Sequence, residues 1–400
     1  MTPRNLKSHY SKFLEGHAGK LHFAAHSHHF WPDVTRDAQL AYWDDCALLS
    51  DQKWNKIFSE VIPKAQKHIA SILKLKDPEQ IVFAPNTHEL TSRLLSLFLE
   101  QSELNILTTS SEFHSWRRQL LRLEEVSAVN VEMVSTEKIL TEKAAFLATV
   151  KEKLKASPDI FFISQVFFDS GIALSDQDLL DLYQAKSEKT MMVVDGYHGF
   201  AAIPTDLSRL EGKIFYLSGG YKYAQAGEGV GFMLVPKGNW RPAYTGWFAE
   251  MGELSQPAGK KIGYPSNALA FMGATQDPSG LYRFNAVWEL MAKEKLAIEQ
   301  IHQQIKSLQL NFIATLPADF ISRWNLKPLY EPQLAWHGHF LAFEASSTEA
   351  AEKLEAILKA SKVIIDRRGP RLRFGFGLYQ SLEDIQRLQE CLVSLPKAHQ

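Results

Sequence analysis

The sequence predicts an α/β fold with a mainly parallel central sheet flanked by helices, and a smaller α+β domain at the carboxyl end. Apolar segments too short for helices begin near residues 81, 105, 160, 191 and 214. Alternation of strands and helices is typical of an open parallel sheet with right-handed crossovers. A length of 400 residues suits two domains. Helical patterns separate the first four apolar segments and lie at 89–100, 116–124, 142–155 and 176–186. The link between the last two segments, 196–213, has a weaker helical pattern.

Segments on either side of these strands complete the large domain, which we place at residues 21–275. Helices are expected at 33–49, with Asp33 as the N-cap, and at 56–74. The glycine-rich segment 227–231 leads into the apolar run FMLV and not into a helix. This context argues against a dinucleotide-binding loop and favours an antiparallel edge strand.

Residues 1–20 and 276–400 are assigned to the small α+β domain. Residues 237–285 are rich in Gly, Pro, Trp and Tyr and have little periodicity, which is typical of functional or interfacial segments. A long helix is expected from Gly280 to about Leu308. The remaining elements are strands near 339–344 and 363–374 and helices near 347–360 and 382–394.

Composition excludes several classes of protein. The net charge of −1 leaves no basic excess to neutralise nucleic-acid phosphates. Only two cysteines occur, Cys46 and Cys391, so a disulfide framework or a cysteine-rich metal site is not expected. The first residues contain no apolar signal segment, and no run of eighteen apolar residues follows. We therefore expect a cytoplasmic protein that binds neither membranes nor nucleic acid.

Two strand ends suggest the chemistry of the site. The run MMVV ends on Asp195, at the sheet edge where α/β folds bind ligands. The next strand ends in Ser-Gly-Gly-Tyr directly before Lys222, and glycines allow a close approach of the backbone. An acid and a lysine so placed suit pyridoxal phosphate, since the lysine forms a Schiff base and the acid keeps the pyridine nitrogen protonated. Alternatively, Asp195 is a turn or N-cap residue and Lys222 is solvated.

Polar residues follow three other predicted strands. Asn86 and Thr87 lie between a strand and a helix, where free backbone N–H groups and the helix dipole favour an anion; simple N-capping is the alternative. His114 follows the next strand, where its imidazole could stack on an aromatic cofactor or merely begin a helix. Asp169 and Ser170 follow the strand that begins near residue 160.

Two arginines of the small domain alternate with apolar residues. Arg371 and Arg373 are separated by Leu372, so both side chains lie on the same face of a strand. An arginine directed into a cleft suits bidentate binding of a carboxylate. We interpret Arg371 as part of a solvated face and Arg373 as a pocket residue.

Four histidines near the amino end could suggest a metal site. His22, His26, His28 and His29 lie within eight residues. No acid or cysteine lies inside the cluster, and the loop lacks the helical spacing that pairs two imidazoles on one metal. A polar loop that lines a pocket, or a surface turn, is the preferred interpretation, and no metal is expected.

These motifs resemble fold-type I pyridoxal-phosphate enzymes of the class V aminotransferase group. Asp195-Gly-Tyr-His198 and Tyr221-Lys222-Tyr223 are similar to the D-x-x-H and Y-K-Y signatures of the group. The segment VIIDRRGPRLRFGFGLYQSLEDIQRL at 363–388 is most similar to the kynureninases. The resemblance extends from about residue 21 to residue 395 and implies the fold of pyridoxal-phosphate-dependent transferases.

The resemblance also implies roles for individual residues. Lys222 would carry the cofactor, Asp195 would bind the pyridinium nitrogen and His198 would lie near the phenolic oxygen. Arg373 would bind the substrate α-carboxylate, with Ser27 and His28 nearby. The resemblance also implies that Asn86, Thr87 and Tyr221 bind the phosphate and that His114 stacks on the cofactor ring. Ser170 is a further implied cofactor contact. Trp247 and Thr275 would come from the second subunit of a homodimer.

Some segments depart from the kynureninase pattern. His26-Ser27-His28-His29 replaces the N-S-L-G loop that contributes to the aromatic substrate pocket. Residues 165–171 read QVFFDSG in place of H-V-N-Y-R-T-G, so an arginine and an asparagine are missing. Gly220 replaces a serine before the Tyr-Lys pair. No cysteine occurs in 361–373, where cysteine desulfurases carry their catalytic cysteine, which argues against desulfuration.

The reaction expected from the resemblance is hydrolytic Cβ–Cγ cleavage of kynurenine or a related α-amino acid. A class V aminotransferase that transfers an amino group to a keto acid is an alternative, as is a β-eliminating lyase. A non-catalytic binding protein that retains the fold is a further alternative, because fold does not fix function.

Overall fold

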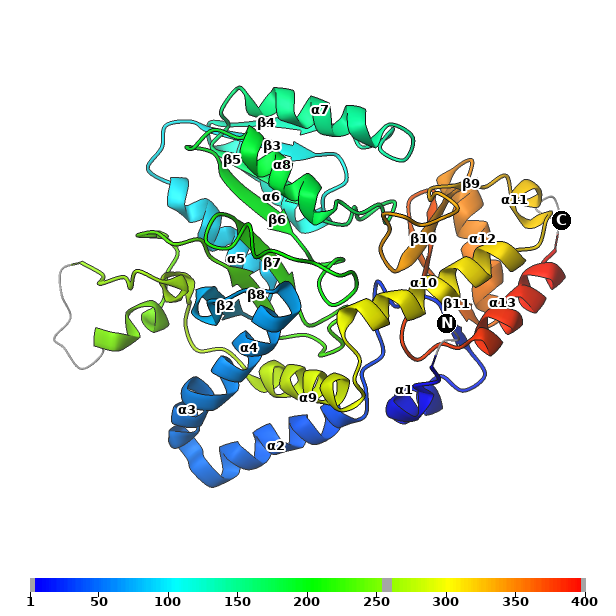
Figure 1. Ribbon diagram of the computed structural model, residues 1–400, viewed down its shortest axis with the longest axis horizontal. Helices are drawn as coiled ribbons and strands as arrows, with labels where there is room; N and C mark the ends of the chain where they lie inside the picture. The colour runs from blue at the N-terminus through cyan, green and yellow to red at the C-terminus, as the bar shows by residue number, and fades with distance from the viewer. Residues whose placement is uncertain (1–3, 254–260, 397–400) are drawn as a thin grey trace.

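A seven-stranded sheet forms the centre of the larger part of the molecule (Figure 1). The computed structural model describes residues 4–253 and 261–396. The strand order is β2-β8-β7-β6-β5-β3-β4. The strands are β2 (Ile81–Ala84), β3 (Leu104–Thr109), β4 (Val129–Val134), β5 (Ile160–Ser164), β6 (Met191–Asp195), β7 (Phe215–Gly219) and β8 (Gly231–Leu234).

The predicted α/β fold is confirmed, with two differences in the sheet. Strands β4, β3, β5, β6 and β7 are mutually parallel, and β8 is antiparallel to both of its neighbours. The prediction that β8 lies at the edge was wrong: its residues are all buried between β2 and β7. Strand β4, which the sequence analysis missed, is an edge strand with only Val134 buried, so it lacks the apolar signal of a central strand.

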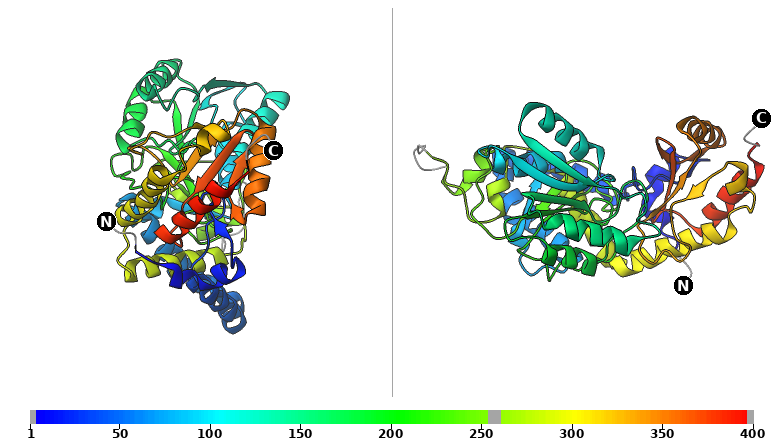
Figure 2. Two further views of the ribbon diagram at one scale, coloured as in Figure 1. Left: turned by 90° about the vertical axis from the view of Figure 1, so that its right-hand side faces the viewer. Right: turned by 90° about the horizontal axis from the view of Figure 1, so that it is seen from above.

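Both faces of the sheet are buried, which explains the continuous apolar runs of its strands. On β5, Phe162 packs into one apolar cluster and Ile163 into the other. On β6, Val193 and Val194 divide in the same way. Helices lie on both sides of the sheet in the view from above (Figure 2).

Apart from α1, which the sequence analysis did not predict, the helices before the small sheet lie close to the predicted ranges. They are α1 (Ser11–Gly16), α2 (Val34–Leu49), α3 (Lys53–Lys56), α4 (Ile62–Leu73), α5 (Thr87–Leu95), α6 (His114–Val126), α7 (Lys143–Leu154) and α8 (Asp176–Ala185). Asp33 does not cap α2 by its side chain. Its carboxylate accepts hydrogen bonds from the backbone N–H groups of Ser11 and Lys12, at 2.9 and 3.0 Å, and so satisfies the start of α1 instead.

Two helices replace the predicted long helix from Gly280 to Leu308. Helix α9 (Ser279–Lys293) ends two residues before Lys295, whose φ of 55° places it in the left-handed region. Helix α10 (Ile298–Thr315) then begins in a new direction. The apolar periodicity continues across this turn, so the sequence pattern does not reveal the break. Residues 254–260 of the predicted irregular stretch lie outside the described residues. Before α9, which begins inside this stretch at Ser279, the described part contains only short 3₁₀ segments.

The carboxyl-terminal part contains a small antiparallel sheet of order β12-β13-β10-β9. Strand β1 pairs in parallel with β11, which places the amino-terminal segment beside this part of the chain. The remaining elements are β1 (Leu21–His22), α11 (Phe320–Arg323), β9 (Lys327–Pro328), β10 (Phe340–Glu344), α12 (Thr348–Ala360), β11 (Val363–Ile364), β12 (Asp366–Arg368), β13 (Arg371–Gly375) and α13 (Leu382–Ser394).

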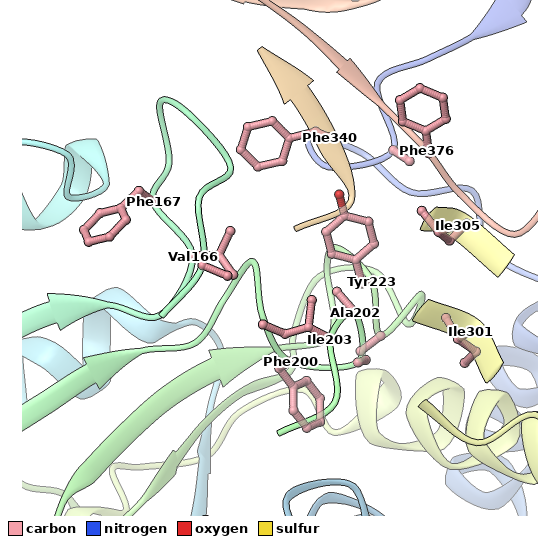
Figure 3. Close-up of a cluster of buried hydrophobic side chains, with 14 of the residues drawn as sticks. Val166, Phe167, Phe200, Ala202, Ile203, Tyr223, Ile301, Ile305, Phe340 and Phe376 are labelled. Carbon is pink, nitrogen blue, oxygen red and sulfur yellow. The ribbon is translucent and has the colours of Figure 1, made fainter. Parts of the chain in front are cut away.

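Helix α10 connects the large and small parts of the molecule (Figures 1 and 2). Its Ile301 and Ile305 belong to the buried cluster that also contains Tyr223 of the large part and Phe340 and Phe376 of the small part (Figure 3). One apolar core therefore joins the segment after Lys222 to the small sheet. Within the described residues, no helix is both long and apolar enough to cross a membrane.

Candidate active site

Lys222 lies in the loop after β7 with only 8% of its surface exposed. Its Nζ is 2.6 Å from His198 Nε2, and Nζ lies 5.1 Å from the centroid of the Tyr197 ring. Burial lowers the pKa of Lys222 to about 7, against the opposing effect of the Asp195 charge. The chain therefore holds a buried primary amine that has a substantial uncharged fraction near neutral pH.

Asp195 ends β6 beside this amine. It is paired in register with Ser164 of β5 and accepts a hydrogen bond of 2.9 Å from the backbone N–H of Tyr197. Burial raises the pKa of Asp195, and the Lys222 charge acts in the opposite direction. The two groups predicted at neighbouring strand ends are thus brought together at the carboxyl edge of the sheet.

A cavity of about 500 Å³ opens at this edge. Most of the predicted site residues line it; these are Ser27, Asn86, Thr87, Asp195, His198, Tyr221, Lys222 and Arg373. Five others do not line it, namely His28, His114, Ser170, Trp247 and Thr275. Residues that the sequence analysis did not select also contribute to the wall: His26, His88, Phe113, Ser115, Ser164, Val166, Phe168, Tyr197 and Arg368.

Phe113, and not its neighbour His114, forms the aromatic wall opposite the amine. Lys222 Nζ is 5.5 Å from the Phe113 ring centroid, and the Phe113 side chain is 40% exposed. His114 begins α6 and its ring packs against Phe113 and Phe168 instead. The sequence analysis selected His114 because an imidazole after a strand can stack on an aromatic cofactor and because the resemblance implied that position. The turn before α6 instead directs the preceding residue, Phe113, into the cavity.

The start of α5 contributes polar groups to the same cavity. Asn86 Oδ1 accepts a hydrogen bond of 3.0 Å from Glu89 N and so caps the helix. Gly231 of β8 lies so close that an added Cβ would be 2.5 Å from the Asn86 carbonyl carbon. The remaining N–H groups of the first turn, with the positive end of the helix dipole, suit a phosphate.

Arg373 projects from β13 into the cavity and is 1% exposed. Its Nε donates a hydrogen bond of 2.8 Å to the Asp366 carboxylate, and Nη2 pairs with the same carboxylate. Nη1 donates a hydrogen bond of 2.6 Å to the Phe168 carbonyl oxygen. Guanidinium has five N–H donors, so two remain for a ligand. Asp366 faces Arg373 across the β12–β13 register, a pairing that the sequence analysis did not foresee.

Arg371 is an ion-pair residue and not the solvated residue that the sequence predicted. Its guanidinium pairs with Asp169 and lies 3.5 Å from Glu344. Ser170, next to Asp169, is buried and accepts a hydrogen bond of 3.3 Å from Ile172 N. Asp169 and Ser170 thus belong to the loop after β5 that packs against the small sheet.

The loop of His26, Ser27, His28 and His29 lies at the cavity, and His26 and Ser27 line it. His26 is fully buried, its ring stacks on Phe340, and neither of its ring nitrogens has a hydrogen-bond partner. His28 Nδ1 lies 3.1 Å from the Tyr221 hydroxyl, and His29 Nδ1 lies 2.6 Å from the Phe30 carbonyl. In the described part of the chain, no group of three or more His, Cys, Asp or Glu residues is arranged to hold a metal ion.

Trp247 and Thr275 lie together on the surface, away from the cavity. The Trp247 indole N–H donates a hydrogen bond of 3.2 Å to the Thr275 hydroxyl, and both side chains are exposed. A role for these residues at a cavity requires a second copy of the chain, as the sequence analysis expected.

The cavity fits pyridoxal phosphate in three ways. It presents a buried amine that has no ion pair with a described carboxylate, and a strand-end carboxylate beside it. A half-exposed phenylalanine offers an apolar face for an aromatic ring. A capped helix start lies at the same cavity for the phosphate.

Comparison with known proteins decides the family. The model of the aminotransferase class-V family matches residues 32–388. The chain belongs to the class V aminotransferase family. Pyridoxal phosphate is accordingly its cofactor, and an amino acid is the substrate class of the family.

Several solved structures share the fold. A complex of the cystine C–S lyase C-DES with its reaction product cysteine persulfide has a TM-score of 0.80 at 18% identity, covering 96% of this chain and 99% of that chain. Apo cysteine desulfurase from Thermococcus onnurineus NA1 has a TM-score of 0.77 at 16% identity, covering 99% and 100%. No curated protein matches by sequence. These structures are lyases and desulfurases, so the finer kynureninase resemblance remains a prediction for this class V enzyme.

Proposed function

We propose that this class V enzyme is a lyase that breaks the bond between the β-carbon of an α-amino acid and its substituent by elimination. The observation that carries the proposal is the Lys222–His198 pair, a buried base with a substantial neutral fraction at neutral pH that faces the cavity. Neither Cys46 nor Cys391 lines this cavity. A leaving group would therefore depart as a free product and would not be transferred to a protein thiol. The shared fold with a cystine C–S lyase supports this choice.

Residues of the cavity wall would hold the cofactor. Asn86, Thr87 and the first turn of α5 would bind the phosphate, and Phe113 would cover one face of the ring. Asp195 would bind the pyridine nitrogen and Lys222 would carry the cofactor covalently. When bound, pyridoxal phosphate supplies an electron sink that stabilises negative charge at the substrate Cα.

The residues of the chain would divide the proton transfers and the binding of substrate. Arg373 would bind the α-carboxylate with its two remaining N–H groups, which fixes the Cα–H bond relative to the base. Neutral Lys222 Nζ would remove the α-proton. The resulting ammonium, or the hydroxyl of Tyr197, which also lines the cavity, would donate a proton to the leaving group.

Hydrolytic Cβ–Cγ cleavage of kynurenine is the second candidate. It is favoured by the aromatic wall of Phe113, Phe168 and Tyr197, which would accommodate an aryl substituent. It shares with elimination the base, the carboxylate site and cleavage at the β-carbon. Transamination would use the same base but requires a keto acid as the second substrate.

Product analysis separates these reactions. The reconstituted holoenzyme is incubated with L-cystine, S-substituted L-cysteines and L-kynurenine, with the Lys222→Ala variant as the control. Elimination predicts pyruvate, ammonia and the sulfur product in equal amounts, because water completes the breakdown of the eliminated amino acid; the sulfur product is a thiol from S-substituted cysteines and cysteine persulfide from cystine. Alanine with anthranilate from kynurenine would establish the second candidate, and amino-group transfer to added keto acid would overturn both.

A further inference from the structure

One face of the β12–β13 hairpin gathers arginines around the cavity. Asp366 and Arg368 of β12 lie on the same side because side chains alternate along a strand, and Arg373 is the cross-strand partner of Asp366. Both arginines line the cavity. Arg367 lies on the opposite side, where it pairs with Glu352 and Glu355 of α12.

The two cavity arginines share a single carboxylate. Asp366 pairs with Arg373 through Oδ2 and lies 3.0 Å from Arg368 Nη1 through Oδ1. Within the described chain, no other carboxylate pairs with either arginine, since Asp169 and Glu344 face Arg371. One positive charge at this end of the cavity is therefore left without a counter-ion.

Two further cations lie on α6, close to His114 and Phe113. Arg117 and Arg118 are exposed in the first turn of α6, where the helix dipole disfavours positive charge, and the described residues form no ion pair with them. Burial lowers the pKa of His114, and the charges of Arg118, Arg368, Arg117 and Arg373 lower it further. The chain as a whole has a net charge of −1, so this concentration is local.

Buried hydrogen-bonding capacity lies at the same end. His26 is fully buried at the cavity wall, its Nε2 is 3.6 Å from Asp366, and that nitrogen has no hydrogen-bond partner. An added Cβ at Gly375 would lie 2.1 Å from Nδ1, so backbone closes the other side of the ring. A buried polar atom without a partner is costly, and a ligand oxygen at this point would satisfy it.

We propose that the substrate carries a second anionic group of the carboxylate class on its side chain, bound by Arg368 while Arg373 holds the α-carboxylate. The proposal rests on the proposed function only in taking an α-amino acid as substrate. The substrate class is then an amino acid whose side chain ends in an acid. Arg117 and Arg118 would attract this dianionic molecule to the cavity.

Binding of unreactive acids tests this proposal independently of catalysis. Dissociation constants of glutarate and valerate, which differ by one carboxylate, are measured from the absorbance change of the bound cofactor in the holoenzyme. Glutarate is expected to bind about tenfold more tightly than valerate, since a charge-assisted hydrogen bond is gained. Equal affinities would overturn the proposal, even if the lyase reaction is observed.

Variants of the β12 strand locate the effect. Arg368→Gln should bring the two acids to within about twofold of each other, whereas Arg368→Lys should retain part of the preference. Arg367→Gln is the matched control and should behave as wild type. A preference that survives in Arg368→Gln, or a loss of cofactor affinity in that variant, would show that Arg368 does not bind the substrate acid. A preference for glutarate without any cleaved product would instead refute the lyase function alone.

Discussion

Burial, and not a neighbouring carboxylate, sets the charge of Lys222. The amine is enclosed beside a neutral imidazole, because burial and the Lys222 charge hold the pKa of His198 well below its usual value. Asp195 is close enough to counteract the effect of burial on Lys222 but does not reverse it. The amine is thus available as a nucleophile and as a base in the same pH range.

The pH dependence of cofactor capture follows from this shift. Lys222 of the cofactor-free protein loses its proton as the pH rises through about 7, so its reactive neutral form increases over that range and then saturates. The rate of reconstitution with pyridoxal phosphate should therefore rise from pH 6 and level off by about pH 8. Stopped-flow absorbance measures the rate. A rate that still climbs tenfold per pH unit above pH 9 would show an ordinary exposed lysine.

The buried Arg373–Asp366 pair is predicted to support the stability of the small domain. Asp366→Asn removes the counter-charge of a guanidinium that is 1% exposed, and breaking such a pair should lower the free energy of unfolding by about 3 kcal/mol. Urea denaturation measures this loss. The control is Asp319→Asn, which removes the exposed partner of Arg323 and should cost less than about 1 kcal/mol. Equal losses would contradict the structural importance of the buried pair.

At the scale of residues, the sequence predicted groups whose position depends on a single strand end. Asp195 and Lys222 follow buried strands directly, so their meeting at one sheet edge follows from a parallel sheet. Phe113 and Asp366 were missed because their positions depend on a turn and on a hairpin register. Neither feature leaves a periodic signal in the chain.

At the scale of elements, the contact of β8 with the start of α5 shapes the phosphate end of the cavity. Gly231 permits the close approach, and Asn86 fixes the first turn of the helix. The sequence predicted the bounds of β2 and β6 well, because each is a buried apolar run between polar residues. It misplaced β8, since nothing local indicates which strands will flank it.

Removal of the α5 cap should weaken the cofactor site. Asn86→Ala is expected to lower the stability of the first turn by about 1 kcal/mol and to raise the dissociation constant of pyridoxal phosphate several-fold. The control is Ser347→Ala, which removes a comparable cap from α12, far along the chain. The Ser347 side chain accepts a hydrogen bond from Ala350 N. Absorbance titration with pyridoxal phosphate measures the dissociation constant of the cofactor in both variants. Equal cofactor affinity in Asn86→Ala and Ser347→Ala would exclude α5 from the phosphate site.

At the scale of the whole molecule, the cavity receives residues from both parts of the chain. Lys222 and Asp195 come from the large sheet, whereas Arg373 and Arg368 come from the small one. The apolar cluster of Figure 3 holds the two parts together. The exposed Trp247–Thr275 pair lies outside this arrangement, and the family resemblance implies that it would reach the site of a second copy.

A homodimer with shared sites is therefore predicted. The holoenzyme should sediment as a dimer, and Trp247→Ala should lower cofactor affinity while the fold is retained. The control is Trp43→Ala, which removes another exposed tryptophan, on α2. Analytical ultracentrifugation with absorbance detection measures both mass and cofactor content. A monomeric wild type with full cofactor affinity would contradict the shared site.

The central claim is that Lys222 carries pyridoxal phosphate in the cavity between the two sheets. Borohydride reduction of the reconstituted protein, followed by peptide mass analysis, tests it most directly. We predict a yellow protein in which reduction fixes the cofactor on the peptide that contains Lys222, and a Lys222→Ala variant without any labelled peptide. A label on another lysine, or labelling that persists in Lys222→Ala, would contradict the assignment of this cavity as the active site.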